Sequence, residues 1–442
     1  MRRLWISGAL ILVGAGAFGC VDAHSPPYKA DPGPSGVPSR AEGSLECLEG
    51  REPIRLWRIG RPAAVRRGAV ARVADGFVVT GIETDGTGWE TPEPETDLDR
   101  VVRVWSPDGA FLPFPPDSDG IMRTGLVTPV ALTSERWGLV WGESRPRGEW
   151  EGAPPQYVVT HLLWSERSNG AWLPPRELAE SGHLGWGEAH TIRHDPSRGV
   201  LMMVTAYETP LVGTEAEILF GGLGRSLAVV PLPGYPRPLS GSFDLTEQGD
   251  VLGGVVARGE GDQSDEFHAL VLRSEDGGRT WTDPELVETM PSHGHLPRDP
   301  RVITDSEGEV HFLWEASEAV GGGHVHHWVG RGGGSDWSKV PVPRTPGVTL
   351  TWVAGLNRCG RLTLARELLG PDSWTIETRM WDGYSWSASH RPFPEMLTAA
   401  LFEGHGADGA WHLGWTGGVG LEGRSPSELA TDTPLWVWAM TP

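Results

Sequence analysis

Short apolar runs, each introduced by a polar turn that ends in glycine, recur along the chain. Their spacing of about 50 to 60 residues is within or just beyond the range of long propeller repeats, and they begin at Gly76, Gly138, Gly199, Gly249, Gly308, Gly360 and Gly409. A strand-like segment precedes each run, and a variable loop, an alternating segment and a tryptophan-led segment follow it. Four such segments separated by Gly, Pro and Asp are typical of an antiparallel blade. The pattern predicts an all-β fold, a seven-bladed β-propeller, with six or eight blades as alternatives.

The two ends of the repeat array are complementary. The last repeat ends with a strand-like segment at residues 434–440, which is the third of that unit. Residues 53–57 precede the first complete repeat and have no partner of their own. We therefore expect this early segment to supply the fourth strand of the last blade, because such closure hides two sheet edges that could otherwise pair with other chains.

One turn carries the octapeptide Ser-Glu-Asp-Gly-Gly-Arg-Thr-Trp at residues 274–281. Serine and aspartate side chains accept hydrogen bonds from backbone N–H groups in turns, and glycine adopts positive φ without strain. The octapeptide matches the Asp-box, also called the BNR repeat, so the chain resembles the sialidase-like β-propellers. This resemblance implies a structural role, in a turn on the face away from the ligand, for Ser274, Asp276, Gly278 and Trp281.

The resemblance does not extend to the sialidase active site. That family carries an early Arg-Ile-Pro signature, for which this chain has Arg58-Ile59-Gly60. Where the family has a late catalytic tyrosine, the chain has Thr351 and Trp352. The catalytic residues of a sialidase are therefore not matched, and the sequence favours a binding module over an enzyme.

The N-terminal segment has the pattern of an export signal. Two arginines precede a largely apolar run from Leu4 to Gly19, which is shorter than a typical transmembrane helix. Residues 17–20 resemble a bacterial lipobox, which implies lipidation of Cys20. We expect a lipoprotein-type signal peptide over residues 1–20 and a protein anchored by lipid to the bacterial cell envelope, outside the cytoplasm. Ordinary cleavage and secretion is the alternative.

Composition divides the rest of the chain into two parts. Residues 21–46 are rich in Pro, Gly, Ser and charge and predict a flexible tether, and residues 47–442 predict the propeller. In an exported protein, Cys47 and Cys359 could form a disulfide that fixes the early strand, and two isolated thiols are the alternative.

The charge of the chain bears on its partners. The formal net charge is −21, which argues against binding to nucleic acid or to a bare anionic lipid surface, since both need a basic patch. We expect a monomer without a cofactor. A transition metal held by His324 and His326, two positions apart on one strand face, is a weak candidate.

The long loops between second and third strands predict one working face. Near that face, a carboxylate ends the second strand in several repeats, and these residues could form an acidic ring at the channel mouth: Glu83, Glu143, Glu208, Glu315 and Glu367. Opposite them, at the starts of first strands, are Arg61, His190, Arg298 and Asp299. Charged strand ends on a polar face are the alternative explanation.

These features lead to two functional hypotheses. The first is an exported, lipid-anchored propeller that binds a glycan or protein ligand on its long-loop face. The second is a glycoside hydrolase, sialidase-like or other, that uses paired carboxylates at the channel mouth.

Overall fold

The structure is a computed structural model. It describes residues 54–59, 65–83, 101–110, 112–115, 122–146, 158–181, 186–195, 197–207, 216–235, 237–259, 266–291, 295–318, 322–331, 336–345, 348–369, 374–391, 397–418 and 435–440. All of them belong to one compact unit, Ala41–Pro442. The other unit, Met1–Arg40, lies outside the described residues. The predicted signal peptide, Cys20 and most of the predicted tether fall in that part and stay predictions.

The described secondary structure is entirely β-strand and forms seven sheets. The first sheets contain β2 (Val65–Val73), β3 (Gly76–Glu83) and β4 (Val101–Trp105); β5 (Met122–Ala131), β6 (Trp137–Pro146), β7 (Val158–Ser168), β8 (Ala171–Trp172) and β9 (Arg176–Ser181); and β10 (Trp186–Asp195), β11 (Gly199–Tyr207), β12 (Ala216–Gly222) and β13 (Ala228–Val229). The next two contain β14 (Pro238–Leu245), β15 (Val251–Arg258), β16 (Glu266–Ser274) and β17 (Glu285–Pro291); and β18 (His295–Thr304), β19 (Val310–Glu318), β20 (Gly322–Arg331) and β21 (Asp336–Val340). The last two contain β22 (Val348–Leu356), β23 (Leu362–Leu369) and β24 (Trp374–Met380); and β25 (Leu397–His405), β26 (Trp411–Gly418), β27 (Leu435–Met440) and β1 (Ile54–Ile59).

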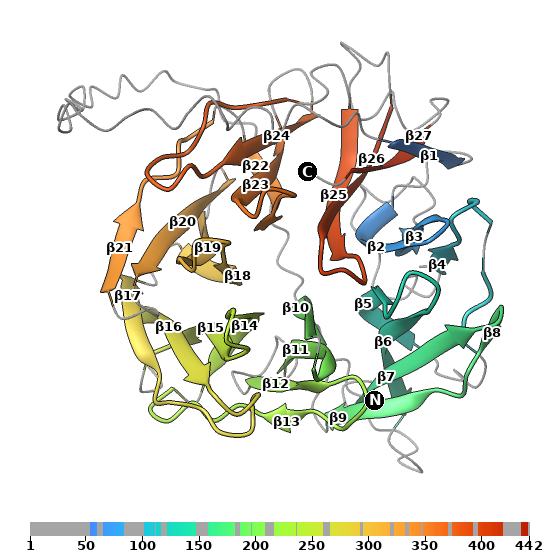
Figure 1. Cartoon of the computed structure of the whole chain (residues 1–442), viewed down its shortest axis with the longest axis horizontal. Helices are drawn as coiled ribbons and strands as arrows, with labels where there is room; N and C mark the ends of the chain where they lie inside the picture. Colours follow the sequence, from blue (N-terminus) through green and yellow to red (C-terminus); the bar gives the residue numbers. More distant parts are fainter. Residues whose placement is uncertain are drawn as a thin grey trace, which may run out of the picture. The chain divides into compact units, whose positions relative to one another are not determined.

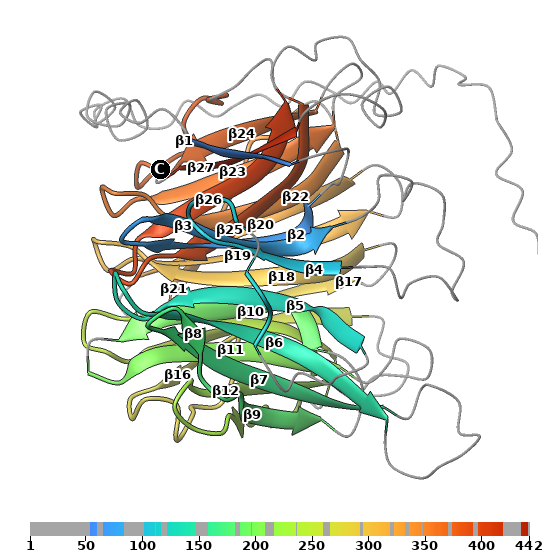
Figure 2. The same ribbon diagram turned by 90° about the vertical axis from the view of Figure 1, so that its right-hand side faces the viewer.

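The first strands of these sheets surround a common axis. Each contacts the first strand of the next sheet, in the order β2, β5, β10, β14, β18, β22, β25 and back to β2. Figure 1 looks along this axis, and Figure 2 shows the strands from the side. The sheets are thus the blades of a β-propeller, and the fold predicted from the repeat is confirmed.

The ring is closed by strands from both ends of the described chain. Strand β1 pairs antiparallel with β27, with Arg58 opposite Trp436, and β27 pairs with β26. One sheet therefore has the order β1-β27-β26-β25. The predicted closure by an N-terminal strand is confirmed.

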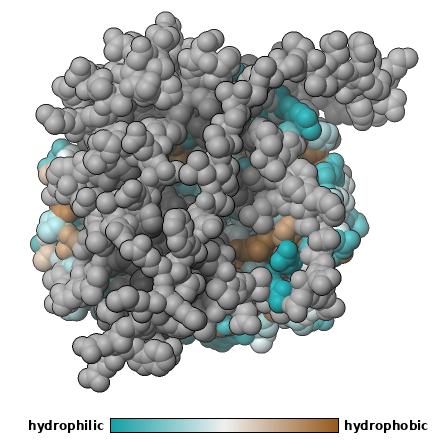
Figure 3. All heavy atoms as spheres, turned by 180° about the vertical axis from the view of Figure 1, so that it is seen from behind, coloured by the Kyte–Doolittle hydropathy of each residue, from teal (hydrophilic) through white to brown (hydrophobic). Residues whose placement is uncertain are grey.

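Hydrophobic side chains fill the space between neighbouring blades. One buried cluster joins Val130 and Leu162 to Met202 of the next sheet, and similar clusters occur at other blade interfaces. Equivalent tryptophans on second strands are among the largest fully buried side chains: Trp141, Trp314 and Trp415. On the face behind that of Figure 1, described hydrophilic and hydrophobic residues lie side by side along the rim (Figure 3).

The repeated glycines meet a local backbone requirement. Six of the seven that introduce the second strands have positive φ: Gly76, Gly199, Gly249, Gly308, Gly360 and Gly409. Glycine adopts this conformation without the steric penalty of a Cβ atom. Gly138 is required for a different reason, because a Cβ there would lie 2.3 Å from the carbonyl oxygen of Ser165.

The Asp-box turn connects β16 with β17. The Asp276 carboxylate accepts hydrogen bonds from the N–H groups of Thr280 and Arg279, each at 2.9 Å, and from the Thr280 hydroxyl at 2.7 Å. These bonds lower the pKa of Asp276 to about 2, and the bond from the Thr280 backbone N–H has the largest effect. Trp281 then packs edge-on against Phe220 of the neighbouring blade. The turn therefore ties two blades together.

Buried histidines add a pH-dependent contribution to stability. His327 and His311 are fully buried, and His327 Nε2 lies 3.2 Å from His311 Nδ1. The pKa of His327 is well below 6.5, mainly because the side chain is buried and secondly because His311 is close to it. Burial is also the main reason that the pKa of His412 is lowered to about 4. In the folded state the imidazoles of His327 and His412 therefore stay neutral at pH values where an unfolded histidine takes up a proton.

Gly278→Ala is expected to destabilise the propeller by about 2–4 kcal/mol. The glycine has a φ of +89°, and a Cβ would lie 2.0 Å from the Phe220 ring. Gly308→Ala is the matched control, since its φ is +78° but nothing lies within 4 Å, and it should cost only about 1–2 kcal/mol. Urea unfolding measures both, and equal losses would contradict the inter-blade contact.

The free energy of unfolding should fall as the pH drops below about 6.5, because the unfolded state then binds more protons than the folded state. His412, with its pKa of about 4, should account for about 2–3 kcal/mol of this loss at about pH 4.5. His412→Phe keeps an aromatic ring against Phe77 and should flatten the profile by that amount. Urea titrations of both proteins across this pH range measure the free energy of unfolding. If its dependence on pH is the same in His412→Phe as in the wild type, His412 is not the source of the loss.

Candidate functional site

A β-bulge recurs in every described sheet, between the first and second strands. The register shifts lie at Arg66/Ala69, Arg123/Val127, Trp186/His190, Pro238/Ser240, Arg298/Arg301, Thr349/Thr351 and Thr398/Ala400. Bulges change the direction in which side chains point and are common beside functional sites. Here the residues that follow the bulges converge on the propeller axis.

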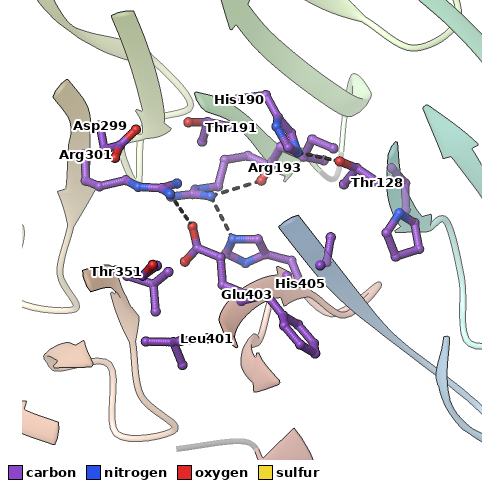
Figure 4. A pocket seen from close by; sticks show the side chains of 18 of the residues that line it. Thr128, His190, Thr191, Arg193, Asp299, Arg301, Thr351, Leu401, Glu403 and His405 are labelled. Carbon is purple, nitrogen blue, oxygen red and sulfur yellow. Dashed lines mark hydrogen bonds and ion pairs between the residues drawn. The ribbon is translucent and has the colours of Figure 1, made fainter. Parts of the chain in front are cut away.

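A central cavity of about 200 Å³ lies where the first strands converge. It is lined by residues of β2, β5, β10, β18, β22 and β25. His194 lines it as well. Figure 4 labels its other polar side chains: Thr128, His190, Thr191, Arg193, Asp299, Arg301, Thr351, Glu403 and His405.

Arg193 is held by contacts from three blades. Its Nε donates to Asp244 Oδ1 at 2.8 Å, and its Nη1 donates to the carbonyl oxygen of Ile192 at 3.0 Å and to His405 Nε2 at 2.9 Å. Asp244 accepts a further hydrogen bond from the N–H of Thr304 at 2.7 Å. The guanidinium therefore links β10 to β14 and, across the ring, to β25.

Arg301 is held by a second ion pair. Its Nη2 lies 2.6 Å from Glu403 Oε1, and Glu403 Oε2 accepts a hydrogen bond from Trp411 Nε1 at 2.8 Å. Both oxygens of the Glu403 carboxylate are thus engaged. The other N–H groups of Arg301 have no partner among the described residues, so they remain available to a ligand.

His405 is neutral in the folded protein. Burial is the main reason that its pKa lies well below 6.5, and the positive charge of Arg193 lowers it further. Because Nε2 accepts a hydrogen bond from Arg193, the single proton is on Nδ1, which faces the carbonyl oxygen of Gly409 at 3.4 Å. The histidine therefore fixes the orientation of Arg193 without adding charge.

Several polar groups of the cavity lack a partner in the described structure. Thr191 and Trp352 are each 3% exposed, and their Oγ1 and Nε1 atoms are buried without a hydrogen bond. The carboxylate of Asp299 has no partner among the described residues, and its backbone has a φ of +52°. His190 differs, since its Nε2 lies 2.6 Å from the Thr128 hydroxyl. The Thr191 and Trp352 atoms are enclosed by protein, and Trp352 packs in the apolar cluster between its blade and the neighbouring one. The half-buried Asp299 carboxylate and the remaining N–H groups of Arg301 are therefore the unpaired groups that face a ligand.

The structure brings together only some of the residues predicted from the sequence. His190 and Asp299 line the cavity. Glu143, Glu315 and Glu367 are at most 2% exposed and do not line it; Glu143 accepts a hydrogen bond from Trp141 Nε1 at 3.3 Å. The side chains of Glu83 and Arg298, and all of Arg61 and Glu208, lie outside the described residues. A ligand-binding role for the glutamates stays a prediction.

The main polar groups of the cavity were not among those predicted. These are Arg193, Arg301, Glu403 and His405. All four lie on first strands: Arg193 is three residues after His190, Arg301 is two residues after Asp299, and Glu403 and His405 are on β25, where the sequence analysis considered no residue. One sequence signal could have identified them: polar residues recur at every second position of first strands, as in Thr191 with Arg193 and Glu403 with His405, and such residues share one face of the strand.

Other predicted sites are described in part. Cys359 is disulfide-bonded; its predicted partner, Cys47, is outside the described residues, and the pairing stays a prediction. Two clusters in the described part have metal-ligand spacing, His161 with Glu177 and Glu180, and Asp305 with Glu309 and His311. Neither contains His324 or His326.

Within the described ranges there is no helix with the length and apolar character needed to cross a membrane.

Known structures share this architecture. No family model matches the sequence, and no curated protein matches it. A protein of unknown function from Dyadobacter fermentans is similar over 74% of this chain and 96% of its own, with 15% identity and a TM-score of 0.50. The Hadza microbial sialidase Hz136 is similar over 78% of this chain and 74% of its own, with 14% identity and a TM-score of 0.44. A Penicillium chrysogenum α-L-arabinanase in complex with arabinobiose is similar over 74% of this chain and 96% of its own, with 12% identity and a TM-score of 0.44. These likenesses concern the fold alone.

Proposed function

We propose that this protein is a carbohydrate-binding propeller whose central cavity takes one sugar residue of a glycan. The observation that carries the proposal is a cavity in which two guanidinium groups are fixed in place beside polar groups that lack partners. Arg301 offers N–H donors and Asp299 offers an acceptor, and both residues are half-buried in the lining. A sugar residue carries hydroxyl groups that both donate and accept, so it matches such a mixed set.

The balance of charge favours a neutral sugar. Arg193 is paired with Asp244, and Arg301 with Glu403. The low pKa of His405 keeps it uncharged. The charged groups that line the cavity then sum to zero, with two arginines against Asp299 and Glu403, and Asp244, which pairs with Arg193 from outside the lining, adds one negative charge that would repel a carboxylate ligand. Hydroxyl groups avoid this repulsion and can donate to Asp299.

The size and walls of the cavity are consistent with one sugar ring. Its volume of about 200 Å³ is below the range of about 300–1,000 Å³ that drug-sized ligands occupy. Trp352, Leu401 and Phe402 contribute apolar surface to the lining. Apolar walls with a few fixed polar groups are typical of sites that orient a small ligand.

Binding is favoured over hydrolysis by the state of Glu403. Glycoside hydrolysis uses two carboxyl groups, one of which has a raised pKa and donates a proton. Both oxygens of Glu403 are already engaged, by Arg301 and by Trp411, so we assign Glu403 the role of positioning Arg301. The presence of Asp299 and Glu403 on one cavity keeps a glycoside hydrolase as the second candidate.

The cellular setting belongs to the same proposal. The two N-terminal arginines and the apolar run that follows them support export, and the lipobox-like sequence supports lipidation at Cys20. A lipid-anchored monomer would then present the propeller to glycans at the extracytoplasmic surface of a bacterial envelope, and secretion is the alternative. A protein ligand on the long-loop face is an alternative that the binding experiment below resolves.

The binding proposal is tested by screening the purified chain on a glycan array and measuring affinities for the bound glycans by calorimetry. Arg301→Gln should weaken binding about tenfold or more, because it removes charge-assisted hydrogen bonds to hydroxyl groups. Arg225→Gln, on an exposed turn remote from the cavity, is the control and should change nothing. Retention of no glycan, or equal affinities for both variants, would reject the cavity as a sugar site.

The hydrolase alternative predicts turnover of a fluorogenic glycoside panel. Under the binding proposal, no glycoside is cleaved above the rate of a heat-unfolded sample. Turnover that is abolished by Asp299→Asn and kept by Arg225→Gln would replace the binding proposal with the hydrolase.

A further inference from the structure

A second cavity, of about 180 Å³, lies between the blade β18–β21 and the blade β22–β24. Its lining comes from β20, β21, the connection at residues 341–344 and Arg366 on β23, and it shares no residue with the central cavity. Its ionisable lining residues are all basic: His324, His326, Lys339, Arg344 and Arg366. In a chain of net charge −21, a cavity without a lining carboxylate points to an anionic ligand.

A buried ionic triad lies behind this cavity. Glu377 is fully buried and accepts hydrogen bonds from Arg366 Nη2 and from Arg379 Nε, the latter at 2.7 Å. The hydroxyls of Thr345 and Ser389 donate to the same carboxylate at 2.9 Å. Burial opposes ionisation, but the two arginines lower the pKa of Glu377 overall. Two guanidinium groups and one carboxylate leave an excess of one positive charge.

Arg366 is the member of the triad that faces the cavity, and its hydrogen bonding is incomplete. It is 5% exposed, and its Nε is buried without a partner. Its Nη2 donates to Pro343, Thr345 and Glu377, whereas its Nη1 has no partner among the described residues. A buried cation with unused donors is costly unless an anion completes it.

The rest of the lining contributes one further uncompensated charge. Lys339 is paired with Glu288 at 2.5 Å, and His326 and Trp328 donate to the same carboxylate. These bonds outweigh burial and lower the pKa of Glu288 to about 2, so the charge of Lys339 is offset. Arg344 is exposed and has no partner among the described residues. The excess positive charge at the cavity therefore resides on Arg344 and Arg366.

We propose that this inter-blade cavity binds a tetrahedral oxyanion, a sulfate or phosphate group. Guanidinium groups match the oxygen geometry of such anions and form strong charge-assisted hydrogen bonds with them. The group could belong to a free ion or to an ester on a glycan, and the experiment separates these sources. The proposal does not depend on the sugar-binding role of the central cavity, since the two linings are separate.

The test is calorimetry of the full chain with sodium sulfate and with sodium phosphate, at constant ionic strength adjusted with sodium chloride. We expect saturable binding to one site for at least one anion. Arg344→Gln should weaken anion binding about tenfold, because it removes a charge-assisted hydrogen bond to the anion. The side chain is exposed, so the substitution should not disturb the fold. Arg279→Gln, an exposed arginine in the Asp-box turn, should bind as the wild type does.

Arg366→Lys is the second variant, because it keeps the charge but removes the planar set of donors. Its near-ultraviolet circular dichroism reports whether the fold is retained, and its affinity should also fall. Tighter binding of a sulfated or phosphorylated monosaccharide than of the inorganic anion would identify an ester as the source, and equal binding would identify a free ion. Absence of saturable binding, or an Arg344→Gln affinity equal to that of wild type, would overturn the proposal.

Discussion

The antiparallel pairing of β1 with β27 is the interaction on which the rest of the structure depends. It joins strands from both ends of the described chain into one blade and leaves the first complete blade beside the last. There the contact is so close that a Cβ at Gly404 would lie 1.4 Å from the carbonyl oxygen of Val70. Backbone hydrogen bonds and tight strand packing thus close the ring together.

Closure of the ring also creates the central cavity. Arg193 and His405 are 212 positions apart in sequence, yet they are joined by a hydrogen bond across the propeller axis. Arg301 reaches Glu403 from another blade. Because each buried charge has a partner on a different strand, the network fixes the positions of the blades as well as the donors that face the cavity. In an open array of sheets these groups would not meet.

The fold could be predicted because its signals are local. Six of the seven repeat glycines have positive φ, so a turn glycine such as Gly199 or Gly308 can be recognised without knowledge of its neighbours. The complementary strands at the two ends then imply closure.

The site could be predicted only in part, because it depends on register. A bulge shifts the pairing and thereby the face on which later side chains lie. In the structure Asp299 and Arg301, which flank the end of such a bulge, line the cavity, whereas Glu315 on the neighbouring strand is buried. No motif in the sequence marks the bulge. The pairing of Arg301 with Glu403 across the ring likewise has no local signal.

The two cavities differ in the charge that they present. The central cavity balances its arginines with carboxylates, whereas at the cavity between blades Arg366 and Arg379 share the single carboxylate of Glu377 and Arg344 has no partner among the described residues. A glycan that carries both neutral sugars and an acidic ester would satisfy both. The most direct measurement is a crystal structure of the chain with a glycan retained in the binding screen. The account predicts a sugar ring in the central cavity within hydrogen-bond distance of Arg301 and Asp299, and a glycan bound elsewhere with this cavity empty would contradict it.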